Sequence, residues 1–152
     1  MHIVLVEPEI PQNTGNIART CALTGTTLHL VKPLGFLLAD RYLKRAGLDY
    51  WDKVTVKVWD GFEEVASAYP EAVFYFATTK ASRCYTDVCY QSADFLVLGR
   101  ETSGLPLALL QAYPDHTIRV PMLNLGRSLN IANTAAVLLY EALRQLGFPG
   151  LE

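Results

Sequence analysis

The apolar residues of this chain fall in short runs separated by polar segments. Runs such as residues 3–6 and 95–98 are continuously apolar, which is typical of strands buried on both faces. Residues 54–58 alternate apolar and polar side chains, as a strand with one exposed face does. The pattern predicts strands at residues 3–6, 28–31, 54–58, 73–77, 95–98 and 117–120.

Helix starts and stops lie between these runs. Asn13 can cap a helix that ends before Gly25, and Asp60 with Glu63 three residues later resembles a capping box. The predicted helices cover residues 13–23, 40–46, 60–69, 104–113 and 129–146. Because strands and helices alternate, the chain is expected to form one α/β domain over residues 1–152, a parallel sheet flanked by helices on both faces.

A ligand site in such a sheet usually lies beyond the carboxyl ends of the strands. The loops after Ala77, Leu98 and Val120 are therefore the places where we expect a site. The last helix supports this location, because residues 131–136 at its start are mostly small and would let a ligand or another backbone approach closely.

Composition limits the possible functions. The net charge of −2 argues against a protein that binds nucleic acid through its overall charge. Any such contact would have to come from local clusters such as Arg41-Lys44-Arg45 and Lys80-Arg83, and these clusters could equally be a solvated surface. The apolar share of 51% is compatible with a homodimer face or with a fully buried sheet. No apolar run approaches the ~20 residues of a membrane span, and residues 1–7 do not resemble a secretory signal, so we expect a cytoplasmic protein.

Several common chemistries lack their sequence signals. Cys21, Cys84 and Cys89 have no CxxC spacing, so we expect no metal site. We expect these cysteines to be reduced thiols. Neither G-x-G-x-x-G after the first strand nor a phosphate-binding G-x-x-x-x-G-K-[ST] loop occurs, and no G-x-S-x-G nucleophile elbow is present. Dinucleotide-binding, P-loop and serine-hydrolase functions therefore lose their main support.

Three polar loops do stand out, and each runs into a predicted helix N-terminus. They cover residues 8–19, 99–106 and 119–133. Free N–H groups at a helix N-terminus can hold an anion or a carboxylate. These loops contain the motifs N-T-G-N-I-x-R at 13–19, G-x-E-x-x-G-L-P at 99–106 and R-S-L-N at 127–130.

Together these motifs resemble the SPOUT class of methyltransferases over residues 3–150. They look closest to the small single-domain tRNA (cytidine/uridine) 2′-O-methyltransferases that modify the anticodon wobble nucleotide. The resemblance implies a C-terminal trefoil knot, a homodimer, tRNA as partner and a pocket for S-adenosylmethionine, with no metal. Carried over by motif, the cofactor pocket would use Ala77, Thr78, Gly99, Glu101, Gly104, Val120, Met122, Ser128, Leu129 and Asn130.

The resemblance also implies catalytic roles for Asn13 and Arg19, which would face the cofactor pocket of the partner subunit. We expect Arg19 to orient the ribose and stabilise the developing alkoxide as a cation, since a guanidinium essentially never deprotonates in proteins. Two departures from the family's usual pattern affect the same loops. Ala132 stands where relatives often have Ser, and the loop cation sits at Arg100 instead of position 103.

Other interpretations stay open at this point. Asn13, Ser128 and Asn130 could serve only as helix caps, Arg19 could be an ordinary surface residue, and Glu101 an ordinary loop acid. For the whole chain, the alternatives are a non-catalytic RNA-binding dimer that retains the fold, and a flavodoxin-like protein that binds a phosphorylated cofactor.

Overall fold

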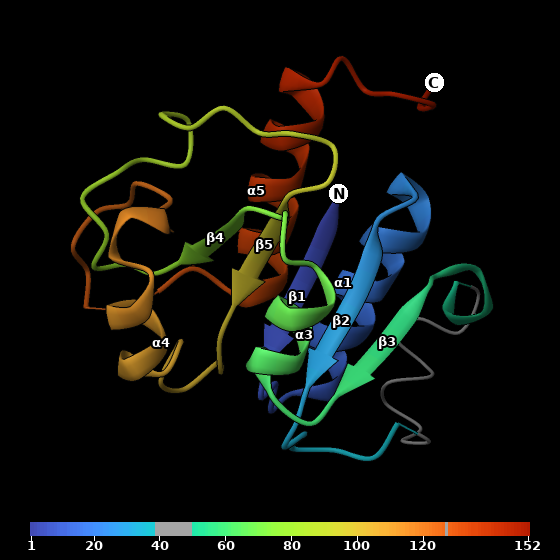
Figure 1. Ribbon diagram of the computed structural model, residues 1–152, viewed down its shortest axis with the longest axis horizontal. Coiled ribbons are helices and arrows are strands. Elements are labelled where there is room, and N and C mark those ends of the chain that lie inside the picture. The colour runs from blue at the N-terminus through green and yellow to red at the C-terminus, as the bar shows by residue number, and fades with distance from the viewer. Residues whose placement is uncertain (39–49, 127) are drawn as a thin grey trace.

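The computed structural model contains one parallel sheet with helices on both faces (Figure 1). It describes residues 1–38, 50–126 and 128–152. The strands are β1 (His2–Val6), β2 (Thr27–Val31), β3 (Val56–Trp59), β4 (Phe74–Ala77), β5 (Phe95–Leu98) and β6 (Thr117–Ile118), in the order β3-β2-β1-β5-β4-β6. The helices are α1 (Pro11–Thr24), α3 (Phe62–Ala68), α4 (Leu107–Ala112) and α5 (Ile131–Gln145), with 3-10 turns η1 (Trp51–Lys53) and η2 (Pro114–His116). The predicted α/β class and parallel sheet are confirmed.

Alternate residues of the central strands build two separate cores. Ile3 and Leu5 of β1 pack on the side of α1 and α5, whereas Val4 and Val6 pack on the side of α3 and α4. In Figure 1, α3 lies in front of the sheet while α1 and α5 lie behind it. Burial on both faces explains why residues 3–6 of β1 and all of β5 are apolar.

The last strand is shorter than the predicted 117–120. β6 pairs with β4 only at Thr117 and Ile118. Arg119 instead donates its backbone N–H to the carbonyl of Arg83 at 3.0 Å, and Tyr85 donates to the carbonyl of Arg119 at 2.9 Å. The chain therefore leaves the sheet early and continues along the loop between β4 and β5.

The predicted start of the first helix is wrong. Asn13 is not its N-cap, because α1 begins at Pro11 after Ile10. Proline suits the first helical position, since its missing N–H would have no partner there. The predicted stop at Gly25 is confirmed by its left-handed φ of 65°.

Other helices begin later than predicted: α4 begins at Leu107 instead of 104, and α5 begins at Ile131 instead of 129. α3 begins at Phe62, and the backbone N–H of Asp60 is accepted by Glu64 at 3.0 Å instead of by Glu63. Asn130 is the N-cap of α5, a role that the sequence had left open beside cofactor binding. The predicted helix at residues 40–46 and the cluster Arg41-Lys44-Arg45 lie outside the described residues.

The cysteines are free thiols, and Cys21 is buried in the core on the α1 side. In the part of the chain that the structure describes, none of the helices has the length and apolar character needed to cross a membrane.

Candidate functional site

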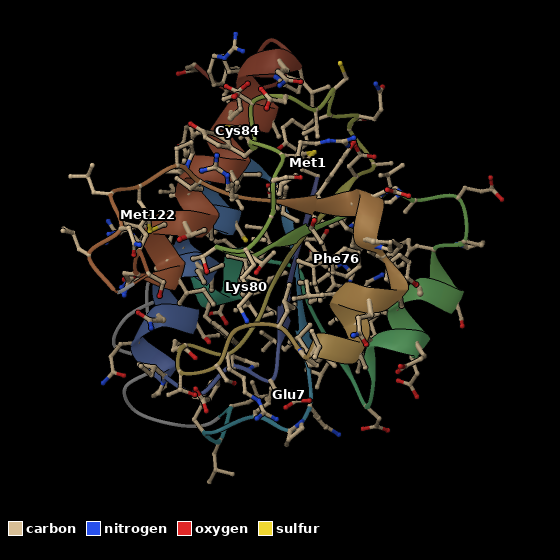
Figure 2. All side chains as sticks on the ribbon, turned by 90° about the vertical axis from the view of Figure 1, so that its left-hand side faces the viewer. Met1, Glu7, Phe76, Lys80, Cys84 and Met122 are labelled. Atoms are coloured by element: carbon tan, nitrogen blue, oxygen red, sulfur yellow. The ribbon has the colours of Figure 1, made fainter. Side chains whose placement is uncertain are left out.

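A cavity of about 470 Å³ lies at the carboxyl ends of β4, β5 and β6. The three loops singled out in the sequence meet around it. Every residue predicted for the cofactor pocket lines this cavity: Ala77, Thr78, Gly99, Glu101, Gly104, Val120, Met122, Ser128, Leu129 and Asn130. Figure 2 shows Met122 on the loop that leads into α5, and Lys80 between that loop and α4. The structure thus brings these residues together, while their role in binding stays a prediction.

Glycine is required where the loop after β5 closes on itself. A Cβ atom on Gly99 would lie 2.2 Å from the carbonyl carbon of Gly104 and 2.3 Å from the nitrogen of Leu105. Arg100 and Gly104 exchange backbone hydrogen bonds of 3.1 and 2.9 Å across the turn. Gly104 itself has a φ of +71°, which L side chains rarely adopt. The result is a compact loop whose backbone forms one wall of the cavity.

Two acidic side chains connect the loop after β1 to the loop after β5 through hydrogen bonds. The carboxylate of Glu101 accepts the backbone N–H groups of Glu9 at 2.8 Å and Ile10 at 3.2 Å. In return, the carboxylate of Glu9 accepts the N–H of Thr102 at 3.1 Å and its hydroxyl at 2.8 Å. Glu101 therefore lies at the N-terminus of α1, where a negative charge is favourable. Its carboxylate is already engaged by the protein.

A chain of amide contacts, here called the amide relay, joins Glu101, Asn13 and Asn130. The Nδ2 of Asn13 donates to Glu101 Oε1 at 3.2 Å, and the Nδ2 of Asn130 donates to Asn13 Oδ1 at 3.0 Å. The Oδ1 of Asn130 accepts the N–H groups of Ala132 at 2.9 Å and Asn133 at 3.3 Å. Because a carboxylate only accepts and a backbone N–H only donates, these contacts set the orientation of both amides. The relay ties the N-termini of α1 and α5 together along the cavity wall.

The structure separates the two residues predicted to be catalytic. Asn13 is 8% exposed and lines the cavity of its own chain, while its expected place opposite a partner's pocket stays a prediction. Arg19 follows six residues later on α1, which turns its side chain by about 120° around the helix axis. It is exposed and does not line the cavity. Its guanidinium carbon lies 4.8 Å from the ring centroid of Tyr50.

Lys80 is a cavity residue that the sequence reasoning did not assign to the pocket. Of the two cations that line the cavity, Arg100 is paired with Glu7, whereas no ion pair is found for Lys80 within residues 1–38, 50–126 and 128–152. Its position directly after the predicted Thr78 loop was the available signal. Arg83, the other cation of the predicted Lys80-Arg83 cluster, is engaged by the protein, because its guanidinium donates to the carbonyl of Asp115 at 3.3 Å.

Histidines with strongly shifted pKa lie away from the cavity. Burial, together with nearby cationic groups, lowers the pKa of His2 to about 4 and that of His29 to about 3. His29 accepts the indole N–H of Trp59 at 3.0 Å, and its other ring nitrogen lies 3.1 Å from His2. These rings pack beside Phe95 on the α3 side of the sheet, where His29 is buried and His2 is half-buried.

The lining of the cavity suits an organic ligand with polar ends. Its volume falls in the range of about 300–1,000 Å³ that is usual for small-molecule sites. Apolar side chains such as Leu98 and Ile118 lie beside the hydroxyls of Thr78 and Ser128 and the backbone of the Gly99 loop. Over the described ranges, no three His, Cys, Asp or Glu side chains are placed to hold a metal ion.

Two known proteins are similar to this chain over nearly its whole length. A tRNA (cytidine(34)-2′-O)-methyltransferase of Methylovorus glucosotrophus is 50% identical over 149 residues, which cover 97% of this chain and 97% of that protein. A solved structure described as structural insights into the 2-OH methylation of C/U34 on tRNA is 44% identical, with a TM-score of 0.91 and coverage of 96% of this chain and 95% of the other.

A more distant structure shares the fold. The SpoU methyltransferase AviRb of Streptomyces viridochromogenes, solved in complex with AdoMet, is 24% identical and has a TM-score of 0.87, covering 96% of this chain and 57% of that chain. The chain also matches the SpoU rRNA Methylase family over residues 1–140. With this match and a full-length relative at 50% identity, the chain belongs to the SpoU rRNA methylase family.

Proposed function

We propose that this protein transfers a methyl group from S-adenosylmethionine to the ribose 2′-hydroxyl of a tRNA nucleotide, at the anticodon wobble position. The observation that carries the proposal is the cavity in which the three motif loops meet. The relatives named for methylation of cytidine 34 support the substrate, since they are similar over nearly the whole chain. A tRNA substrate also supports a cytoplasmic location.

The cavity residues fit this cofactor by their chemistry. The apolar side chains of Leu98, Val120 and Leu129 would hold a flat base, and the hydroxyls of Thr78 and Ser128 would meet its polar groups. The backbone around Gly99 and Gly104 would add further hydrogen bonds. When bound, the cofactor supplies a methyl group activated by its attachment to a sulfonium.

The protein's own contribution is alignment and electrostatic stabilisation. Holding the ribose oxygen in line with the methyl group can lower the barrier by several kcal/mol. We assign to Arg19 the stabilisation of the oxygen as its proton passes to water or to a phosphate oxygen of the RNA. Asn13 is engaged at both ends of its amide, so we assign it a positioning role within the amide relay. Lys80 is suited to contact an anionic oxygen of the RNA or of the cofactor's carboxylate.

A homodimer would bring Arg19 to a pocket, because on its own chain it points elsewhere. Apolar side chains are exposed on α1 and α5: Leu23 is 54% exposed, and Tyr140 47%. Arg19 and Leu23 are four residues apart and therefore share one stripe of α1. A second copy that covers this stripe would bury the apolar side chains and present Arg19 to the partner's cavity.

The dimer is tested by light scattering at fixed protein concentration. Tyr140→Glu places a charge within the proposed interface, and we expect it to shift the mass from dimer to monomer. Ser67→Glu on the exposed side of α3 adds the same single negative charge and, as a matched control, should stay dimeric. A wild-type chain that is monomeric at micromolar concentration would contradict the dimer.

The proposed fold includes a trefoil knot in the C-terminal segment. The segment from Arg119 onward runs along the loop between β4 and β5, which is the loop it would have to cross. α5 is tied to the same loop, since Gln145 donates to the carbonyl of Val88 at 3.1 Å and accepts the N–H of Tyr90 at 3.0 Å. These ties support a path in which the segment is threaded through the loop.

The central experiment is a methylation assay on bulk tRNA with labelled S-adenosylmethionine, followed by mapping of the modified nucleotide. We expect 2′-O-methylation at position 34. Arg19→Ala should abolish turnover while calorimetry still detects cofactor binding of nearly wild-type affinity. An Arg19→Ala variant with full turnover would remove Arg19 from the mechanism. A wild-type protein that binds RNA but no S-adenosylmethionine would instead support a non-catalytic RNA-binding dimer.

A further inference from the structure

Tyr50 and Arg19 lie on separate elements that are both anchored in the core. On α1, Ile17 and Ala18 beside Arg19 are 1% and 0% exposed. Tyr50 directly precedes η1, where the N–H of Lys53 closes a turn onto the carbonyl of Tyr50 at 2.9 Å and Trp51 packs against the core. Because both backbones are held, the contact between the two side chains has a defined geometry.

The guanidinium of Arg19 lies over the face of the Tyr50 ring, with 4.8 Å between its central carbon and the ring centroid. A contact of this kind uses the flat face of the guanidinium and the negative face of the ring. In a guanidinium that stacks flat on a ring, the in-plane N–H donors point away from the ring and can still bind substrate. An ion pair with a carboxylate would instead occupy these donors and neutralise the charge.

Lys53 adds a second cation at the same place. Its ammonium nitrogen lies 5.8 Å from the centroid of the Tyr50 ring. Arg19 and Lys53 are both exposed and both lie close to the half-buried ring, and two positive groups near each other strengthen the local attraction for a phosphate or a developing alkoxide.

We infer that Tyr50 is a positioning residue for methyl transfer: its ring holds the guanidinium of Arg19 in a fixed, fully charged orientation with its N–H donors directed at the substrate. The inference rests on the proposed function and deepens it. A free arginine side chain loses rotamer entropy when it is ordered. Stacking on Tyr50 before substrate arrives removes part of that cost from the reaction.

The test compares Tyr50→Leu with Tyr50→Phe, which keeps the ring. Under saturating tRNA and S-adenosylmethionine, we expect Tyr50→Leu to lower kcat about fivefold or more, from loss of the cation–π contact. Tyr50→Phe should stay within about twofold of wild type. The cofactor's Kd by calorimetry should not change in either variant, because Tyr50 does not line the cavity.

A further measurement separates positioning from general stabilisation. The Arg19 side-chain N–H signal in NMR should carry a ring-current shift that Tyr50→Phe retains and Tyr50→Leu removes. An active wild-type enzyme with unchanged kcat in Tyr50→Leu would overturn the inference alone, as would equal losses in the Leu and Phe variants. A wild-type chain that neither binds the cofactor nor methylates tRNA would end the inference together with the proposed function.

Discussion

The amide relay offers a measurable link between the cavity wall and the stability of the fold. In Asn13→Ala, Glu101 loses the Nδ2 donor at 3.2 Å and Asn130 loses its acceptor at 3.0 Å. A hydrogen bond to a charged group contributes about 1.5–3 kcal/mol and one between neutral groups about 1 kcal/mol. Since Asn13 is 8% exposed, water replaces these partners poorly, and we expect the free energy of unfolding to fall by about 3 kcal/mol.

At neutral pH, Asn13→Asp should have a lower free energy of unfolding than Asn13→Ala. It replaces the donor with a second carboxylate beside Glu101, and two like charges about 4 Å apart repel by about 4 kcal/mol at an effective dielectric constant of 20. As pH falls, one of the two carboxyl groups takes up a proton and again provides a donor. The difference in the free energy of unfolding between Asn13→Asp and Asn13→Ala should therefore become smaller as the pH falls from 8 to 5.

Thermal melting followed by circular dichroism measures both effects. For a chain of this size, about 3 kcal/mol corresponds to a fall in Tm of about 6–12 °C. Asn16→Ala is the matched control, because Asn16 lies on the exposed side of the same helix and its variant should melt close to wild type. If Asn13→Ala melted within about 1 °C of Asn16→Ala, the relay would contribute nothing and the reasoning would be refuted.

Two further predictions concern the loop after β5 and the histidines His2 and His29. Gly99→Ala should lower the free energy of unfolding by about 3 kcal/mol or more, because its Cβ would lie 2.2 Å from the backbone of Gly104. The control Gly61→Ala, whose Cβ meets only the flexible Glu63 side chain, should lower it by no more than about 1 kcal/mol. Urea denaturation measures both, and equal losses in the two variants would contradict the prediction. The pKa values of His2 and His29, about 4 and 3, lie below their unfolded value of 6.5, so the unfolded state binds more protons and stability should fall as pH drops from 6.5 toward 4. The urea midpoint measures this fall, and a His2→Gln/His29→Gln variant that shows the same pH dependence as wild type would exclude these rings as its source.

The fold class and the location of the site were predictable because they depend on local patterns. Short apolar runs such as residues 95–98 mark strands covered on both sides, and the alternation with helices leaves few topologies other than a parallel sheet. The carboxyl ends of such strands share one edge, so the loops after Ala77, Leu98 and Val120 had to meet. The start of α1 was misjudged because Asn13 is a common capping residue, although Pro11 was the better signal.

The sequence by itself determined the elements, the sheet and the set of loops that form the cavity, since side-chain periodicity and glycine positions act over a few residues. Only the tertiary structure decided which way each functional side chain points. Asn13 turns inward because Glu101, 88 residues away, accepts its amide, while Arg19 on the same helix turns outward to Tyr50. Such contacts depend on the packing of distant segments against one helix, and a six-residue spacing alone does not reveal which face of that helix is covered.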